Sequence, residues 1–266
     1  MKTRIALIFL VTILFSCSSD IKEKREYYED GNIHLKYFKI ENSLLYKVEE
    51  YNNTGNLISV TFENKNSKLD STGYYYEDNK LISTVNFVDG EQTGLAQWYY
   101  PNGNVEESVY LVKGIRYGEH KFFRIDGTLK QINYYKLFNG EPVFNGVKRY
   151  DEHGELMPDL SEFADLTLLK DTVKITDTLF YKLDIILSED LLTRAILGDF
   201  NSNFEIDEQF GLKQVDINSL NYIFPTKVGK NTLRILFEFR KDIEKKDTIK
   251  TYIGKIYLEK DYVVLE

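Results

Sequence analysis

A 24-residue repeat is the feature that most limits what this chain can fold into. An aromatic residue, three residues, Gly or Asn, one residue and an aliphatic residue recur six times, with successive spacings of 24, 24, 24, 24 and 27 residues. The first aromatics are Tyr27, Tyr51, Tyr75, Tyr99, Phe123 and Tyr150, and the turn positions hold Gly31, Gly55, Asn79, Gly103, Gly127 and Gly154. Gly and Asn adopt positive φ at low cost. The period therefore predicts a stack of similar units, each with a turn at a fixed place.

A second turn in each unit indicates that a unit consists of two strands. The stretches DGEQTG (89–94) and KGIRYG (113–118) are again offset by 24 residues. The segments between the turns are short and rich in aromatic and β-branched residues, which is typical of strands. We therefore expect an all-β protein with an elongated antiparallel meander of about six hairpin repeats over residues 27–156. At about 4.8 Å per strand, this sheet is roughly 55 Å long.

The repeat resembles a known family. GLAQWYYPNGNVEESVYLVKGIRYG (94–118) is similar to the bacterial variant of the MORN repeat, which is rich in aromatics and has a PNG or DGK turn followed by G-x-x-x-G. The resemblance extends over about residues 27–156, and the first two units lack the second glycine pair, so we expect them to be less regular. Bacterial proteins with these repeats are often catalogued as antitoxins of toxin–antitoxin systems. The resemblance thus implies a cytoplasmic antitoxin as one possible function.

The N-terminus indicates export. Residues 1–16 combine Lys2 and Arg4 with an apolar run that is shorter than the roughly 20 residues a membrane-spanning helix needs, as in a signal peptide. The run ends at Leu14-Phe15-Ser16-Cys17, which resembles the lipobox of bacterial lipoproteins. The resemblance implies that Cys17 is the lipidated first residue of the mature chain, with residues 17–26 as a tether. The alternative is an ordinary cleaved secretory peptide.

Charge and targeting together restrict the partners. Without residues 1–16 the chain keeps 32 basic and 42 acidic residues, a formal charge of −10, and its basic residues are interleaved with acidic ones. Nucleic acid is excluded as a partner because binding it needs a basic patch. Membrane attachment is expected through the acyl chains. The aspartate that retains some lipoproteins in the inner membrane is replaced by Ser18, so the outer membrane of the cell envelope is the expected location.

The C-terminal part differs from the repeats. The period stops after Leu156, and residues 157–171 are expected to be a linker. Residues 172–266 contain alternating and β-branched segments separated by turn-forming stretches, which favours a small β-sandwich. Within it, Leu191–Leu197 is open to interpretation as a helical turn.

Aromatic residues outside the repeated position are candidates for contact with a partner. A ring at a fixed place in every unit is expected to pack against the neighbouring unit, because one hairpin cannot bury its own apolar face. Among the aromatics beside the repeated position, Trp98, Tyr100 and Tyr76 are the candidates for contact with a partner. Trp98 is the sole tryptophan, and tryptophan is enriched among residues that dominate binding interfaces.

The residues that carry catalysis or bind metals are few. One cysteine and three histidines exclude a disulfide framework and a Cys/His zinc cluster. The histidines, at 34, 120 and 153, are expected on turns or strand edges, solvated or at an interface, so we expect no enzyme activity and no cofactor. A calcium loop is the one metal candidate, with possible oxygen ligands at Asp199, Asn201, Asn203 and Asp207. Phe204 and Phe210 replace its glycine and its bidentate glutamate, so a polar loop rich in Asn and Asp is the alternative.

These observations favour a lipid-anchored envelope protein that acts as a non-catalytic binding or scaffolding module through its repeat sheet. The expected partner is another envelope protein or a glycan. One alternative is an envelope enzyme, or enzyme subunit, acting on glycans at the seam between the two domains. A concave pocket with two or more carboxylates near residues 157–171 would favour that alternative. The antitoxin is the other alternative.

Overall fold

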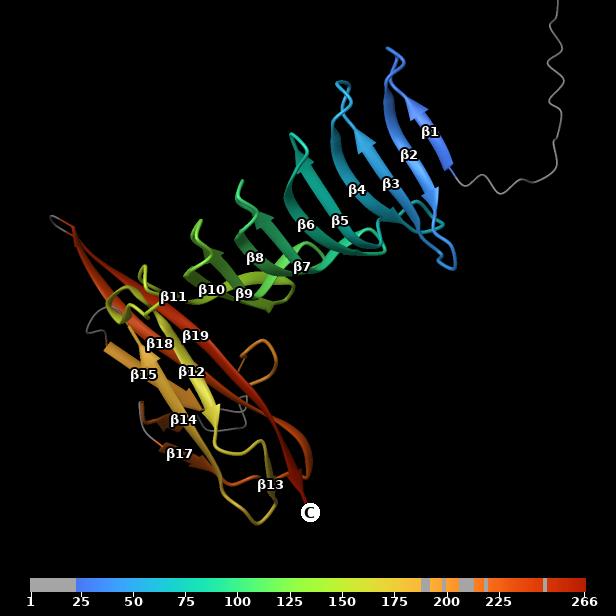
Figure 1. Cartoon of the computed structure of the whole chain (residues 1–266). Coiled ribbons are helices and arrows are strands. Elements are labelled where there is room, and N and C mark those ends of the chain that lie inside the picture. Colours follow the sequence, from blue (N-terminus) through green and yellow to red (C-terminus); the bar gives the residue numbers. More distant parts are fainter. Residues whose placement is uncertain (1–22, 188–191, 198–199, 206–212, 218–219, 246–247) are drawn as a thin grey trace, which may run out of the picture.

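The protein consists of a long single-layer ribbon joined to a two-sheet body (Figure 1). The computed structural model describes residues 23–187, 192–197, 200–205, 213–217, 220–245 and 248–266. The described residues are almost entirely strands and turns, with one 3-10 turn, η1 (Pro158–Leu160). The prediction of an all-β fold is confirmed.

The ribbon is an antiparallel sheet of 11 strands in which each strand pairs with the next one along the chain. The meander expected from the repeat is therefore confirmed. Its strands are β1 (Glu23–Tyr27), β2 (Ile33–Lys39), β3 (Tyr46–Tyr51), β4 (Leu57–Glu63), β5 (Ser71–Glu77), β6 (Lys80–Val88), β7 (Glu91–Tyr99), β8 (Val105–Val112), β9 (Ile115–Phe123), β10 (Leu129–Phe138) and β11 (Glu141–Arg149). Since β1 begins at Glu23, the last residues of the expected tether belong to the sheet.

Two kinds of turn alternate along the ribbon. At one edge, the repeated aromatic ends a strand and the repeated aliphatic begins the next, as at Tyr99 and Val105. At the other edge, Asp89-Gly90, Lys113-Gly114 and Asn139-Gly140 form two-residue turns with positive φ at both positions. This conformation matches the twist of a hairpin, and it requires residues that tolerate the left-handed region.

Neighbouring turns are linked by hydrogen bonds that recur with the repeat. The hydroxyl of Tyr28 donates to the carbonyl of Tyr51 at 2.8 Å, and the hydroxyl of Tyr100, three units later, donates to the carbonyl of Phe123 at 2.9 Å. In the next unit the guanidinium of Arg124 donates to the carbonyl of Tyr150 at 2.6 Å. In these three units the residue after the repeated ring thus ties one turn to the following one.

One face of the ribbon carries most of its buried side chains, and we call it the inner face. Cross-strand pairing aligns its central row, in which Val85 faces Ala96, Ala96 faces Val109 and Val109 faces His120. These four residues are 6%, 0%, 2% and 3% exposed, and Val48 and Val147 are buried in the same row.

Of the repeated rings, Tyr75 packs against a buried cluster of the ribbon, whereas the expectation that these rings form the core is wrong for the others. Tyr27 is 57% exposed, and the other five rings are half-buried. The pairing register shifts beside the ring, for example between Glu50 and Tyr51 and between Trp98 and Tyr99. Except for Tyr75, which lies within β5, the rings therefore lie at or just past the end of their strands, where fewer neighbours cover them than at mid-strand.

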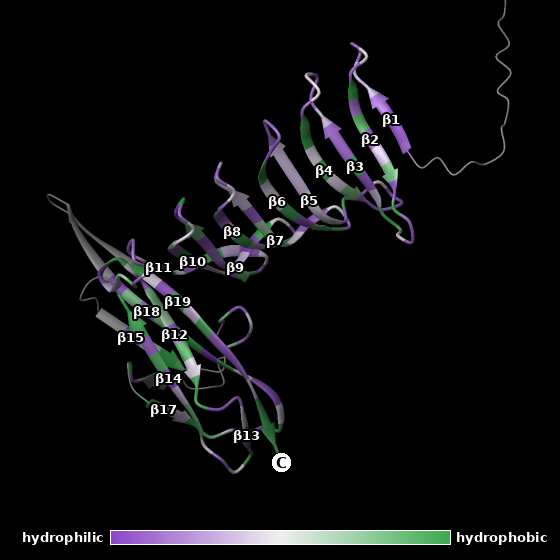
Figure 2. Cartoon of the chain, viewed as in Figure 1, coloured by the Kyte–Doolittle hydropathy of each residue, from purple (hydrophilic) through white to green (hydrophobic). Residues whose placement is uncertain are grey.

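The C-terminal body is a sandwich of two sheets. A three-stranded sheet has the order β12-β14-β17, and a five-stranded sheet has the order β13-β19-β18-β15-β16. The strands are β12 (Phe163–Leu168), β13 (Thr172–Lys174), β14 (Leu179–Ile186), β15 (Leu192–Leu197), β16 (Lys213–Val215), β17 (Leu220–Ile223), β18 (Gly229–Lys245) and β19 (Thr248–Leu265). Apolar residues are concentrated in this body, whereas the ribbon strands mix polar and apolar residues (Figure 2).

The two sheets of the sandwich share one core. Its fully buried members include Leu179, Tyr181 and Leu183 from β14, and Ile235 and Phe237 from β18. Burial raises the pKa of Tyr181 to about 12, and its hydroxyl has no hydrogen-bond partner among the described residues.

Two boundary expectations in this region need correction. The expected linker 157–171 contains β12, whose Phe163, Ala164 and Leu166 are buried, so only the first residues of that stretch connect the two parts. Ala164 and Leu166 of β12 belong to the sandwich core, which the pattern SEFADLTLL did not reveal. The segment considered as a helical turn is strand β15, held between β16 and β18.

The ribbon is fixed to the sandwich at its last hairpin. Asn145 of β11 forms two hydrogen bonds with the backbone of Tyr257 in β19, donating to its carbonyl at 3.0 Å and accepting from its amide at 2.7 Å. The amide of Val147 also donates to the carbonyl of Glu162 at 2.7 Å. The backbones of Gly146 and Glu162 lie so close together that a Cβ at Gly146, whose φ is +125°, would be 2.8 Å from the carbonyl oxygen of Glu162.

We predict that Gly146→Ala destabilises the protein more than Gly140→Ala in the same hairpin. Positive φ costs an alanine about 1–2 kcal/mol at either position. At Gly140, whose φ is +83°, no atom lies within 4 Å of the added Cβ, whereas at Gly146 the clash adds about 1 kcal/mol or more. Urea denaturation of the two variants measures the difference, and equal losses would contradict this account of the junction.

Candidate functional site

A line of aromatic and polar side chains crosses the inner face beside its buried row. Successive pairs run from Ser59 to Tyr75, Ser83, Trp98, Glu107 and Phe122, one residue from each strand between β4 and β9. Since side chains alternate along a strand, Trp98 shares its face with Ala96. Tyr75 packs against the buried cluster of that face.

The rings of this line recur on every second strand. Tyr75, Trp98 and Phe122 come from β5, β7 and β9, and two strand spacings separate successive rings by about 9.6 Å. Small or acidic residues, Ser83 and Glu107, lie between them. Trp98 is 36% exposed, and the other two rings are half-buried. We call Tyr75, Trp98 and Phe122 the ring ladder.

Sequence reasoning found one member of the ring ladder and missed two. Trp98 and Phe122 directly precede the repeated ring, and by analogy Tyr74 should occupy this place in the third unit. Instead Tyr75 does, because the register of β5 shifts after Tyr75, whereas that of β7 shifts before Tyr99. The two-residue Asp78-Asn79 turn, with both φ angles positive, accounts for the difference.

The other two predicted contact residues lie elsewhere. Tyr100 is in a turn, where its hydroxyl donates to the carbonyl of Phe123. Tyr76 is half-buried at the end of β5, opposite Leu81. Tyr76 and Tyr100 therefore lie at the edge of the sheet, apart from Trp98, and a role for them in binding stays a prediction.

The ring ladder leads into a hollow over the first three units. A cavity of about 280 Å³ is lined by Tyr75 together with His34, Glu50, Ser59, Thr61 and Glu63, among others. The hydroxyl of Ser59 donates to the carboxylate of Glu50 at 3.1 Å, and Nε2 of His34 lies 3.6 Å from the same carboxylate. Burial raises the pKa of Glu63, and the nearby charge of Glu26 adds to the shift. The hollow thus offers several hydrogen-bonding oxygens within a short distance.

His120 lies in the middle of the inner face, so the expectation of a solvated or interfacial histidine is wrong for this residue. It is 3% exposed, its Nε2 contacts the carboxylate of Glu107, and its ring centroid lies 4.3 Å from that of Phe122. Its Nδ1 has no hydrogen-bond partner among the described atoms. Burial lowers the pKa of His120, which outweighs the opposing effect of Glu107. The other two histidines are more accessible, His153 most of all.

The calcium candidate falls partly outside the described residues, since Asp199 and Asp207 are not among them. The side-chain oxygen of Asn201 accepts from the backbone amides of Asn203 and Glu205 at 2.8 and 3.1 Å. Phe204, at a φ of +55°, is buried. Within the described part of the chain, no cluster of three or more His, Cys, Asp or Glu residues is placed to hold a metal ion. Phe200 and Phe204 of this turn belong to a buried hydrophobic cluster, and calcium binding stays a prediction.

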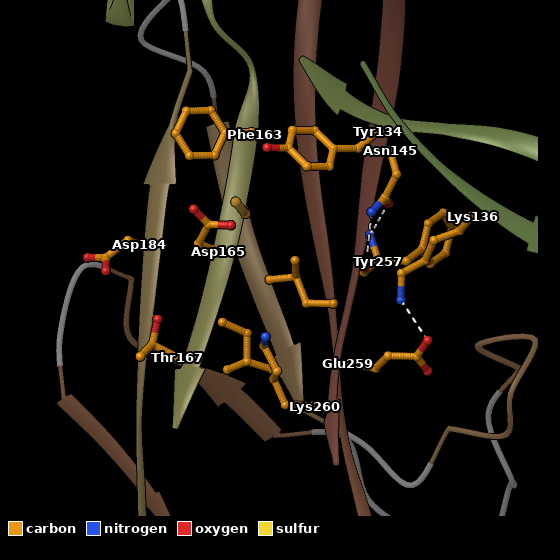
Figure 3. Close-up of a pocket in the computed structure, with 13 residues that line it drawn as sticks. Tyr134, Lys136, Asn145, Phe163, Asp165, Thr167, Asp184, Tyr257, Glu259 and Lys260 are labelled. Carbon is orange, nitrogen blue, oxygen red and sulfur yellow. Dashed lines mark hydrogen bonds and ion pairs between the residues drawn. The ribbon is translucent and has the colours of Figure 1, made fainter. Parts of the chain in front are cut away.

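A second cavity of about 320 Å³ lies at the seam between the ribbon and the sandwich (Figure 3). It is lined by Asp165 and Asp184 of the three-stranded sheet and by Glu259 of β19, with Tyr134 and Lys136 from the ribbon. It therefore meets the condition set for an enzyme at the seam, a pocket with at least two carboxylates near residues 157–171.

Lysines pair with these carboxylates. Lys148 lies 2.8 Å from Asp165, Lys136 lies 3.0 Å from Glu259, and Lys182 lies 2.6 Å from Asp184. Burial lowers the pKa of Lys136 despite the presence of Glu259. Burial opposes the charge of Lys148, but Asp165 and Tyr134 together outweigh it, so the pKa of Lys148 is raised. Lys182 and Asp184 both belong to β14, whereas the other two ion pairs join the ribbon to the sandwich and make the seam an electrostatic contact between the two domains.

Comparison with known proteins supports the repeat. Residues 92–112 match the MORN repeat variant family. No curated protein matches the chain. Among solved structures, a mutant of S. aureus TarM in complex with fondaparinux, alpha-GlcNAc-glycerol and UDP is similar at 20% identity and a TM-score of 0.27. The match spans 41% of this chain and 21% of that one, so the chain spans about a fifth of that structure, and at this score the similarity carries no argument. Across the described residues, no helix has the length and apolar character needed to cross a membrane.

We predict that the buried His120 makes stability depend on pH. Because its pKa is lowered in the folded state, the unfolded chain binds more protons below the usual histidine value of about 6.5. The free energy of unfolding should therefore fall as the pH drops through this value and on toward the folded-state pKa. Urea denaturation at neutral and mildly acidic pH measures the loss.

His120→Phe should reduce the loss between the two pH values, whereas His153→Gln, at a side chain that is 77% exposed, should leave it unchanged. The groups acting on His120 are Glu107 and, more weakly, Arg116. An undiminished loss in His120→Phe would show that another group causes it.

Proposed function

We propose that this protein is a lipid-anchored component of the bacterial cell envelope that acts as a non-catalytic binding or scaffolding module. The observation that carries the proposal is the inner face of the ribbon, where rings and hydrogen-bonding groups line a single-layer sheet. A second sheet covers the apolar face in the sandwich, whereas no second sheet in the described part of the chain covers the ring ladder, and Trp98 is 36% exposed. Partly exposed rings in a fixed array favour binding over a purely structural role.

The anchor is proposed from the sequence. Cys17 follows an apolar run and a small residue, and the described part of the chain starts at Glu23, a few residues later. Lipid chains on Cys17 would hold the ribbon close to a membrane, with the outer membrane favoured. Attachment through several acyl chains is essentially permanent, whereas a single chain binds reversibly.

Labelling and cross-linking in cells test both parts of the proposal. Radiolabelled palmitate should enter the wild-type protein and be absent from Cys17→Ala, and globomycin should block maturation. A photo-reactive p-benzoylphenylalanine placed at Trp98 on the inner face should cross-link a partner in the membrane fraction. The same residue placed at Tyr110, which is 55% exposed on the opposite face, is the matched control.

The lipid anchor and the binding surface can each be contradicted independently of the other. An unlabelled wild-type protein that stays soluble would support the antitoxin suggested by the repeat family over the anchored protein. Equal cross-linking from positions 98 and 110, or none from either, would remove the inner face as the binding surface. Mass spectrometry of the adduct distinguishes a peptide partner from a sugar.

A second candidate function is an enzyme, or enzyme subunit, acting on glycans at the seam. The specific observation in its favour is the cavity lined by Asp165, Asp184 and Glu259. A glycosidase needs one carboxylic acid and one carboxylate across the scissile bond, whereas each of these groups is paired with a lysine. Release of reducing ends from envelope glycans by the wild type, lost in Asp165→Asn or in Glu259→Gln, would establish this function in place of the first.

A further inference from the structure

We infer that the ring ladder binds an uncharged, linear glycan of β-linked hexopyranose units that lies along the ribbon. This inference rests on the proposed binding function and names the class of ligand for the inner face. Three features carry it, namely the spacing of the rings, the groups between and beside them, and the charge of the face.

The spacing of the rings fits a sugar chain with a two-residue repeat. In a β-linked chain each ring is turned over relative to its neighbour, so alternate sugars present the same face to a flat surface. Two linked pyranose rings extend over a length close to the separation of about 9.6 Å between successive members of the ladder. The three rings can therefore contact alternate sugars of one chain, with one sugar against each of Tyr75, Trp98 and Phe122.

The groups between the rings fit the intervening sugars. Ser83 lies between Tyr75 and Trp98, and Glu107 lies between Trp98 and Phe122. A serine leaves room for a bulky ring substituent, and a carboxylate accepts hydrogen bonds from sugar hydroxyls or amides. Glu107 is positioned by the buried His120, so its orientation is fixed before a ligand arrives.

The hollow at the end of the ladder supplies further hydrogen-bonding groups. Beyond Tyr75, the line of paired residues continues through Ser59 to Glu50, and both line the cavity of about 280 Å³. Thr61 and Glu63 add a hydroxyl and a carboxylate to the same cavity. One end of a sugar chain seated on the ladder would enter this hollow, whose lining combines these polar groups with the apolar Leu35, Val48 and Leu69.

The charge of the face decides between classes of glycan. Glu50, Glu63 and Glu107 all lie on the inner face, and the chain as a whole carries a formal charge of −8. Polyanions such as uronic acid or phosphate polymers are therefore repelled. A neutral chain, such as one of N-acetylhexosamine units, meets no such repulsion and offers many hydroxyl donors to the carboxylates.

Fluorescence of the sole tryptophan provides a direct test, because Trp98 is the middle ring of the ladder. The full-length protein in detergent is titrated with chitohexaose, with chitobiose and with an oligogalacturonate of similar length. Chitohexaose, which is long enough to reach all three rings, should change the emission saturably and bind at least about tenfold more tightly than chitobiose. The oligogalacturonate should have no effect.

Variants at the outer rings assign the effect to the ladder. Tyr75→Ala and Phe122→Ala should each weaken chitohexaose binding by about fivefold or more. Tyr74→Ala is the matched control, because Tyr74 is the neighbouring residue on the opposite face and is 36% exposed. Circular dichroism confirms that each variant is folded, and the dependence on oligosaccharide length needs no variant at all.

Several outcomes would overturn the inference. These are the absence of any saturable change with chitohexaose, equal affinity for chitobiose and chitohexaose, and equal loss in Tyr74→Ala and Tyr75→Ala. If cross-linking from position 98 then still captures a peptide in the membrane fraction, the binding function stands and its ligand is a protein. If neither experiment detects a ligand, the proposed function fails as well.

Discussion

The structure of the ribbon depends on one constraint, that a single-layer sheet has no second layer to cover its apolar face. Burial must therefore come from neighbours on the same face. Residues in the middle of a strand have neighbours on both sides, and there the chain places small or branched side chains such as Val85, Ala96 and Val109. Larger rings flank this row and cover it in part. The same arrangement leaves one side of each ring accessible, which is why the inner face is both the core of the ribbon and its candidate binding surface.

The turns decide which rings reach the inner face. The pairing register shifts beside most of the repeated aromatics. The position of this shift decides which side chains near the end of the strand point to the inner face, because a shift of one residue moves a side chain to the other face. In the third unit, the shorter turn moves the shift by one residue and brings Tyr75 into line with Trp98 and Phe122. A small difference in turn length thus determines the alignment of the ring ladder, which extends over several hairpins.

The junction limits how far the repeat can continue. The last hairpin packs against the sandwich, where Asn145 bonds the backbone of Tyr257 and Phe138 packs on the same tyrosine at a centroid distance of 4.5 Å. The sandwich also caps the exposed edge of β11, since the amide of Val147 bonds Glu162. The charged β1, with the sequence EKREY, lies at the other end of the sheet, where charge opposes pairing with another chain.

The sequence by itself determined the all-β class and, within the ribbon, the order of the strands and the place of most turns, because a fixed period with Gly or Asn at one position permits only local hairpins. It also identified Trp98 as an aromatic residue that lies outside the repeated position and is therefore available to contact a partner. Tertiary structure alone decided that His120 is buried beside Glu107, that β12 belongs to the sandwich, and that three carboxylates meet at the seam. These features depend on register and on contacts between residues far apart in the chain, such as Asn145 and Tyr257, and neither is encoded in local spacing.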